Sequence, residues 1–136
     1  MAKPYQVAAI PIKRSVSGDV EVLLVTSRES RRWVVPKGWP WRKVKDEDAA
    51  AGEAWEEAGV QGNVLPEPLG SFTYAKRRKY KMRPLEVFVY LLEVTQEAQS
   101  WPEHHQRERR WFNLIDAAGM VAEPALKDIL LELNSR

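Results

Sequence analysis

DEDAAAGEAWEEAG, residues 46–59, carries the clearest structural signal in this chain of 136 residues. Three acids open the stretch, where the helix dipole favours negative charge, and Gly59 stands where a left-handed cap would close a helix. The stretch therefore predicts one α-helix. Its predicted buried face comprises Ala51, Ala54, Trp55 and Ala58.

An acidic stripe follows the same helix. At about 100° per residue, Glu53, Glu56 and Glu57 share an arc of about 100°. The i,i+3 and i,i+4 carboxylates repel one another, and two of them lie in the last turn, where the dipole disfavours negative charge. A bound divalent cation, Mg²⁺ or Mn²⁺, would explain this arrangement, because carboxylate oxygens are its preferred ligands. The alternative is a solvated helix face without a ligand.

Short apolar runs on the N-terminal side predict strands. Val7–Ile12 and Val20–Thr26 flank Ser17–Asp19, which contains Gly18, and together predict a β-hairpin. Residues 33–35 predict a third strand that ends at a proline. Residues 38–45 have no clean period and contain a second proline, so they predict a loop.

The C-terminal side continues the alternation of strands and helices. Further strands are predicted at 69–74, 87–94 and 111–112, and a second helix at 125–133, after a proline at a first helical position. Strands with two interspersed helices predict an α/β sandwich around one mixed sheet. We expect a single domain spanning residues 1–136.

Composition excludes several classes of protein. The chain has no cysteine, and so no disulfide, thiolate metal ligand or cysteine nucleophile. It contains no run of about 18 apolar residues and no apolar segment typical of a signal peptide near Met1. These features predict a cytoplasmic protein without a membrane partner.

Charge is strongly segregated, although the net charge is only +2. Bases dominate residues 28–45, acids dominate residues 46–57, and residues 76–83 contain only bases among their charged residues. Alternating blocks of opposite sign indicate a site for a ligand that is both anionic and cation-bound.

The acidic stripe belongs to a longer motif. Residues 38–60, GWPWRKVKDEDAAAGEAWEEAGV, resemble the Nudix box, G-x5-E-x7-R-E-U-x-E-E-x-G-U, with U aliphatic. The matching positions are Gly38, Glu53, Glu56, Glu57, Gly59 and Val60. The resemblance implies a Nudix-type α/β/α sandwich. It also implies hydrolysis of a pyrophosphate bond with Mg²⁺ or Mn²⁺ as cofactor.

Segments outside the box are similar to the diphosphoinositol polyphosphate phosphohydrolase branch of this superfamily. They are residues 21–25, 28, 32–36, the basic run after Phe72, and residues 87–90, 101–103 and 109–112. The branch implies a polyphosphorylated small molecule as substrate, such as a dinucleoside polyphosphate, a diphosphoinositol polyphosphate or another nucleoside diphosphate derivative. The sequence leaves the oligomeric state open.

The resemblance also implies roles for individual residues. Glu53 and Glu57 would bind the metal, helped by a backbone carbonyl at Gly38, and Glu56 would be the general base. Glu103 would be either a further carboxylate of the site or a surface residue. Predicted phosphate-binding residues are Arg28, Lys37, Lys76, Arg77, Arg78, Lys79 and Arg107.

Two positions depart from the box: Val44 replaces its first glutamate and Gly52 replaces its arginine. We expect Arg42, Lys43 or Lys37 to take over from the missing arginine. The departures keep two alternatives open. One is a catalytically weak module that binds polyphosphate or RNA, with Tyr80 available for stacking; the other is a pyrophosphohydrolase of RNA 5′ ends.

Overall fold

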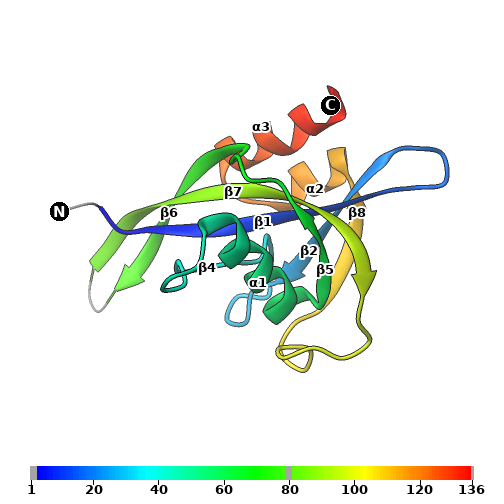
Figure 1. Ribbon diagram of the computed structural model, residues 1–136. Coiled ribbons are helices and arrows are strands. Elements are labelled where there is room, and N and C mark those ends of the chain that lie inside the picture. The colour runs from blue at the N-terminus through cyan, green and yellow to red at the C-terminus, as the bar shows by residue number, and fades with distance from the viewer. Residues whose placement is uncertain (1–2, 79–80, 136) are drawn as a thin grey trace.

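The computed structural model describes residues 3–78 and 81–135 (Figure 1). The strands are β1 (Tyr5–Arg14), β2 (Val20–Thr26), β3 (Trp33–Val34), β4 (Lys37–Gly38), β5 (Val60–Val64), β6 (Gly70–Arg78), β7 (Lys81–Glu97) and β8 (Arg109–Asn113). The helices are α1 (Asp46–Ala58), α2 (Leu114–Met120) and α3 (Pro124–Glu132), followed by a 3₁₀ turn at Leu133–Ser135. Within the described residues, no helix is both long and apolar enough to cross a membrane.

The strands form one mixed sheet. Its central path is β3-β2-β1-β7-β5, while β4 pairs with β1, β6 with β7, and β8 with β2. Strands β1 and β7 run parallel, with Tyr5 opposite Glu86 and Ile12 opposite Glu93, and the other pairs are antiparallel. The predicted mixed sheet is confirmed.

Side chains of β1 alternate between two apolar layers, as the period of two in a strand requires. Ala8, Ile10 and Ile12 pack in the cluster that contains residues of α2 and α3. Val7 and Ala9 pack in the cluster that contains the alanines of α1. Figure 1 shows α1 on one side of the sheet and α2 and α3 on the other, so the α/β/α sandwich is confirmed.

Several elements differ from the sequence prediction. The basic run at residues 76–83, which lies between the strands predicted at 69–74 and 87–94, belongs mostly to strands β6 and β7, because their pairing continues to Arg78 opposite Lys81. Residues 37–38 form strand β4, although the sequence predicted that the chain leaves the sheet before them. Strand β5 and helix α2 were not predicted, since the middle of β5, Gln-Gly-Asn, is polar and exposed and α2 has only seven residues.

The buried face of α1 is also shifted from the prediction. Ala49, Ala50, Ala54 and Ala58 are completely buried, and the carboxylate-bearing Glu57 is buried with them. Trp55, expected in the core, is only half-buried. Because of this shift, Glu57 of the acidic stripe faces the interior, where the segments around residues 37–38 and 101–109 contact it.

Candidate active site

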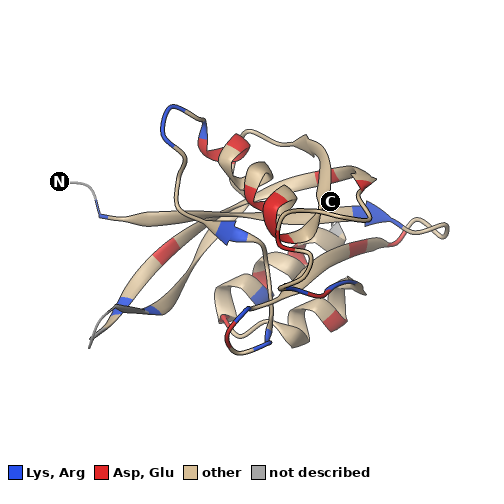
Figure 2. Cartoon of the chain, turned by 90° about the horizontal axis from the view of Figure 1, so that it is seen from below, with Lys and Arg blue, Asp and Glu red and all other residues tan. Residues whose placement is uncertain are grey.

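Helix α1 presents its carboxylates next to basic segments of the chain. Figure 2 shows acidic residues along α1, and basic residues in the loop that precedes it and near the tip of the β6–β7 hairpin. Glu53 and Glu57 are one turn apart, and the Glu57 side chain is close enough to influence the pKa of Glu53. This proximity makes the helix face a local concentration of negative charge.

Glu57 is the most buried carboxylate of the site, with 7% of its surface exposed. Its Oε1 accepts a hydrogen bond of 3.3 Å from the backbone N–H of Lys37. Its Oε2 lies 3.6 Å from Nη2 of Arg107. Burial raises the pKa of Glu57 to about 8, although the Arg107 guanidinium opposes the shift. Without a bound cation, the Glu57 carboxyl therefore holds a proton at neutral pH.

Glu53 lies between a backbone segment and an aromatic ring. Its Oε2 accepts a hydrogen bond of 2.9 Å from the indole Nε1 of Trp41. A β-carbon built on Gly38 would lie 2.5 Å from Oε2 and 2.6 Å from Oε1 of Glu53. Burial raises the pKa of Glu53, and the hydrogen bond from Trp41 lowers it. A side chain at position 38 would displace this carboxylate from its present place.

Glu56 and Glu103 complete the acidic surroundings. The backbone oxygen of Glu56 accepts a 3.0 Å hydrogen bond from the Glu103 backbone N–H, which ties the segment after β7 to α1. Glu56 is half-buried, and its charge contributes to the raised pKa of Glu53. Glu103 accepts a 2.7 Å hydrogen bond from Nε of Arg107, so it belongs to the site and is not a detached surface residue.

Arg107 is held by the protein on several sides. Its guanidinium contacts the carboxylates of Glu57 and Glu103 and donates a 3.0 Å hydrogen bond to the backbone oxygen of Thr26. Only 9% of its side chain is exposed. Arg107 was predicted to bind phosphate, and the structure places it as the counter-ion of two acids. The sequence contained no signal for this pairing, which brings together segments far apart in the chain.

Lys37 is a partly buried member of the predicted phosphate-binding set. Its Nζ is 4.6 Å from the centroid of the Tyr74 ring, and burial lowers its pKa, opposed by the charge of Glu57. The charge of Lys76 also lowers the pKa of Lys37, so these two cations are neighbours. Lys37 thus lies within electrostatic reach of the Glu57 carboxylate.

Other predicted phosphate-binding residues are more peripheral. Arg28 is exposed, and its Nη1 donates a 3.1 Å hydrogen bond to Gln106. Arg77 and Arg78 belong to strand β6, opposite Met82 and Lys81. Lys79 and Tyr80 lie outside the described residues. The structure thus brings Lys37 and Arg107 towards the carboxylates, places Lys76 near Lys37, and leaves Arg28 at the surface.

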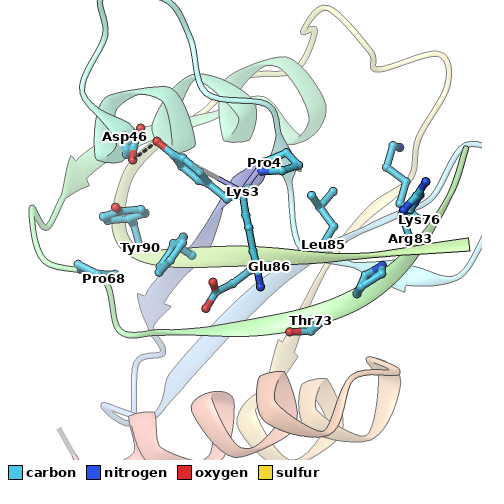
Figure 3. Close-up of a pocket in the computed structure, with 13 residues that line it drawn as sticks. Lys3, Pro4, Asp46, Pro68, Thr73, Lys76, Arg83, Leu85, Glu86 and Tyr90 are labelled. Atoms are coloured by element: carbon cyan, nitrogen blue, oxygen red, sulfur yellow. Dashed lines mark hydrogen bonds between the residues drawn. The ribbon is translucent and has the colours of Figure 1, made fainter. Parts of the chain in front are cut away.

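A large cavity lies beside the glutamates and not over them (Figure 3). Its volume is about 1100 Å³, and it lies between the start of α1, the N-terminal segment, and strands β6 and β7. Tyr5 donates a 2.9 Å hydrogen bond to Asp46 at one end, and Lys76 and Arg83 lie at the other (Figure 3). Lys76, a base of the β6–β7 hairpin, therefore borders this cavity and also lies near Lys37 of the site.

The donor set fits a hard divalent cation. Glu53 and Glu57 offer adjacent carboxylates, and the side-chain-free backbone of Gly38 faces Glu53. In the described part of the chain, no three His, Cys, Asp or Glu side chains are gathered closely enough to enclose a metal ion. Mg²⁺ commonly uses one or two carboxylates together with water and substrate phosphates, so a two-carboxylate site suits it.

Sequence reasoning missed the residues that close the C-terminal end of α1. That end has no basic residue of its own in the last turn. Nε1 of Trp101 donates to the Glu57 backbone oxygen at 3.0 Å, and Nη1 of Arg109 donates to the Ala58 backbone oxygen at 2.9 Å. These donors satisfy carbonyls that a helix leaves unpaired, and Arg109 supplies the positive charge that the dipole favours.

Comparisons with known proteins agree with this geometry. The family model described as "NUDIX domain" matches residues 4–132. "Nudix hydrolase 16, mitochondrial" of Arabidopsis thaliana is 35% identical over 123 residues, which cover 87% of this chain and 68% of that protein. "Diphosphoinositol polyphosphate phosphohydrolase 3-beta" of Bos taurus is 36% identical over 106 residues, covering 76% of this chain and 61% of that protein.

A solved structure shows the same fold. An Ap4A hydrolase binary complex from C. elegans superposes with a TM-score of 0.70 at 20% identity, covering 98% of this chain and 96% of that one. The family model spans nearly the whole chain, and the curated relatives are hydrolases by name. The chain belongs to the Nudix family and is a Nudix hydrolase.

Proposed function

We propose that the protein is a divalent-metal-dependent pyrophosphohydrolase that cleaves a phosphoanhydride bond in a polyphosphorylated small molecule. The observation that supports this proposal best is the pair of adjacent carboxylates, the partly buried Glu53 and the buried Glu57, beside the cations of Lys37 and Arg107. Binding of a cation stabilises the ionised form of a carboxyl that burial otherwise keeps protonated, so cation binding and loss of the proton are coupled. We therefore expect the site to bind an anionic substrate together with the metal ion.

Each glutamate has a separate part in the proposed mechanism. Glu53 and Glu57 would hold the cation, with the Gly38 carbonyl as a further oxygen donor. A bound Mg²⁺ supplies charge neutralisation for the phosphates and acidifies water. Glu56, half-buried at the edge of the pair, takes the proton of the attacking water. The new bond forms between water oxygen and phosphorus, the P–O bond of the anhydride bridge breaks, and the bridging oxygen leaves with the departing phosphate.

The cations support a polyphosphorylated substrate. Lys37 lies near the Glu57 carboxylate, Lys76 lies near Lys37, and the exposed Arg28 adds positive charge at the surface. Arg77, Arg78 and Lys79 stay predicted phosphate-binding residues. Lysine and arginine bind phosphate through charge-assisted hydrogen bonds. A dinucleoside polyphosphate or a diphosphoinositol polyphosphate is the proposed substrate, in keeping with the names of the Bos taurus relative and the C. elegans neighbour. A cytoplasmic location stays a prediction from the sequence.

An assay of both substrate classes tests the proposal. Turnover of a dinucleoside polyphosphate and of a diphosphoinositol polyphosphate is measured with Mg²⁺, with Mn²⁺ and with a chelator, and the products are identified. We expect turnover only with metal, and a loss of at least about 100-fold in kcat in Glu56→Gln, as for removal of a general base. Binding without cleavage, unchanged by Glu56→Gln, would instead establish the polyphosphate-binding alternative.

The RNA alternative has its own signature in the same experiment. Release of pyrophosphate or phosphate from a 5′-triphosphorylated RNA, with affinity that falls steeply as salt rises, would assign the site to RNA ends. Absence of metal-dependent turnover on every diphosphate compound would reject the proposed function.

A further inference from the structure

Gly52 occupies a position in α1 that has no room for a side chain while the Trp41 indole keeps its place. A β-carbon built there would lie 2.7 Å from Cζ2 and Cζ3 of the Trp41 indole, and closer still to Cη2. Glycine is the least favourable residue after proline in the interior of a helix. Its presence in the middle of α1 therefore has a steric reason: the indole of Trp41 rests directly on the helix backbone.

The loop before α1 fixes Trp41 in this place. The Trp41 backbone oxygen accepts a 3.2 Å hydrogen bond from the Val44 backbone N–H, and Lys43 has a φ of 61°, in the left-handed region. The tight turn returns the chain towards the start of α1. Arg42 and Lys43, which the sequence suggested as substitutes for the box arginine, are exposed. The group beside Gly52 is an indole and not a cation.

The indole also reaches the neighbouring carboxylate. Its Nε1 lies 2.9 Å from Oε2 of Glu53, while the backbone of Gly38 lies against the same carboxylate. Two glycines thus make this arrangement possible. Gly38 leaves space for the Glu53 carboxylate, and Gly52 leaves space for the indole that donates a hydrogen bond to this carboxylate. A neutral donor fixes the orientation of a carboxylate and leaves its negative charge available to a cation.

We propose that Trp41 is a positioning residue for the metal site. Seated on Gly52, its indole N–H holds the Glu53 carboxylate in the orientation that binds the divalent cation. This inference rests on the proposed function, because it assigns Trp41 to a site where Glu53 is a metal ligand. It also explains why this chain combines Trp41 with Gly52: a side chain at position 52 and the ring of Trp41 compete for one space.

Binding of Mn²⁺ alone tests the inference without using turnover. The dissociation constant is measured by electron paramagnetic resonance for the wild type, Trp41→Phe and Trp55→Phe. Trp41→Phe keeps an aromatic ring over Gly52 and removes the N–H. Trp55→Phe is the matched control, since Trp55 lies two residues after Glu53 and about 200° around the helix from it.

We expect Trp41→Phe to weaken Mn²⁺ binding by about 10-fold, the loss typical of removing a hydrogen bond to a metal ligand. Its melting temperature without metal should stay close to that of the wild type, and Trp55→Phe should bind Mn²⁺ as the wild type does. Wild-type affinity in Trp41→Phe, or an equal loss in both variants, would overturn the inference. No binding of Mn²⁺ to the wild type would reject the proposed metal site itself, and the inference with it.

A second variant keeps the test decisive if Trp41→Phe does not fold. Gly52→Ala retains Trp41 but introduces a β-carbon where the indole lies. We expect it to weaken Mn²⁺ binding by at least as much as Trp41→Phe, because the ring must move away from Glu53. Unchanged Mn²⁺ affinity in Gly52→Ala would overturn the inference.

Discussion

The two carboxylates of the site are held in different ways. Glu57 is buried against a full positive charge, the guanidinium of Arg107, which is delivered by the segment before β8. Glu53 is held by a neutral indole N–H from the loop that immediately precedes α1. A charged partner competes with an incoming cation for the same carboxylate, whereas a neutral donor does not. The surroundings of Glu57 therefore contribute to the stability of the fold and, through burial, raise the pKa of its carboxyl. The surroundings of Glu53 fix the orientation of its carboxylate.

The largest expected effect comes from removing either carboxylate charge. Glu57→Gln and Glu53→Gln keep the shape of the side chain and remove one oxygen ligand. Since loss of outer contacts to a ligand already costs about 10–100-fold in metal affinity, we expect each variant to lose more than about 100-fold. Calorimetric titration with Mn²⁺ measures it. A variant that binds Mn²⁺ as tightly as the wild type would show that its carboxylate is not a ligand.

Arg107→Met tests the contribution of the charged partner of Glu57. The substitution removes a buried cation that contacts two acids, and we expect a loss of about 3 kcal/mol in the free energy of unfolding at pH 9, the lower end of the range for a broken buried ion pair. Urea denaturation of the metal-free protein measures the loss. Arg28→Met, at an exposed arginine, should change stability by less than about 0.5 kcal/mol. Equal effects in the two variants would contradict the structural role of Arg107.

The raised pKa of Glu57 predicts a pH dependence of stability. Between its ordinary value of 4.5 and about 8, the folded protein keeps the Glu57 proton that the unfolded chain releases. The free energy of unfolding of the metal-free protein should therefore fall as pH rises through this window. Urea denaturation between pH 5 and pH 9 checks the direction, and Glu57→Gln should remove this component. Stability that rises with pH because of Glu57 would show that the carboxylate is ionised in the fold.

The smallest expected effect concerns Gly52 and the indole of Trp41, which is the neutral partner of Glu53. In an ordinary helix, Gly52→Ala would increase the free energy of unfolding by about 1 kcal/mol. Here the added β-carbon meets the indole of Trp41, so we expect a loss instead. In a Trp41→Ala background the same change should stabilise the protein by about 1 kcal/mol. Thermal denaturation of the four proteins in this double-mutant cycle measures the coupling, and additive effects would mean that the two residues do not share one space.

Sequence patterns predicted the elements whose signals are local. The N-terminal acids and Gly59 defined α1 correctly, and Gly59 has the expected left-handed conformation, with a φ of 68°. The β1–β2 hairpin and α3 were also predicted, because turn residues and apolar spacing lie within a few positions of each other. Strand β5 was missed, since its polar middle residues become a strand only by pairing with β7.

The candidate site likewise has one part that the sequence predicted and another part that it did not. Spacing along one helix placed Glu53, Glu56 and Glu57 on one face, because 3.6 residues per turn is a property of the backbone itself. No local pattern could show that Glu57 is buried against Arg107, or that the indole of Trp41 fills the space above Gly52. The first contact joins segments whose meeting depends on the path of the sheet, and the second depends on how the loop before α1 folds back onto the helix. The amino-acid sequence thus determined which carboxylates stand together, and the tertiary structure decided which partner holds each of them, because burial and distant contacts arise only once the chain has packed.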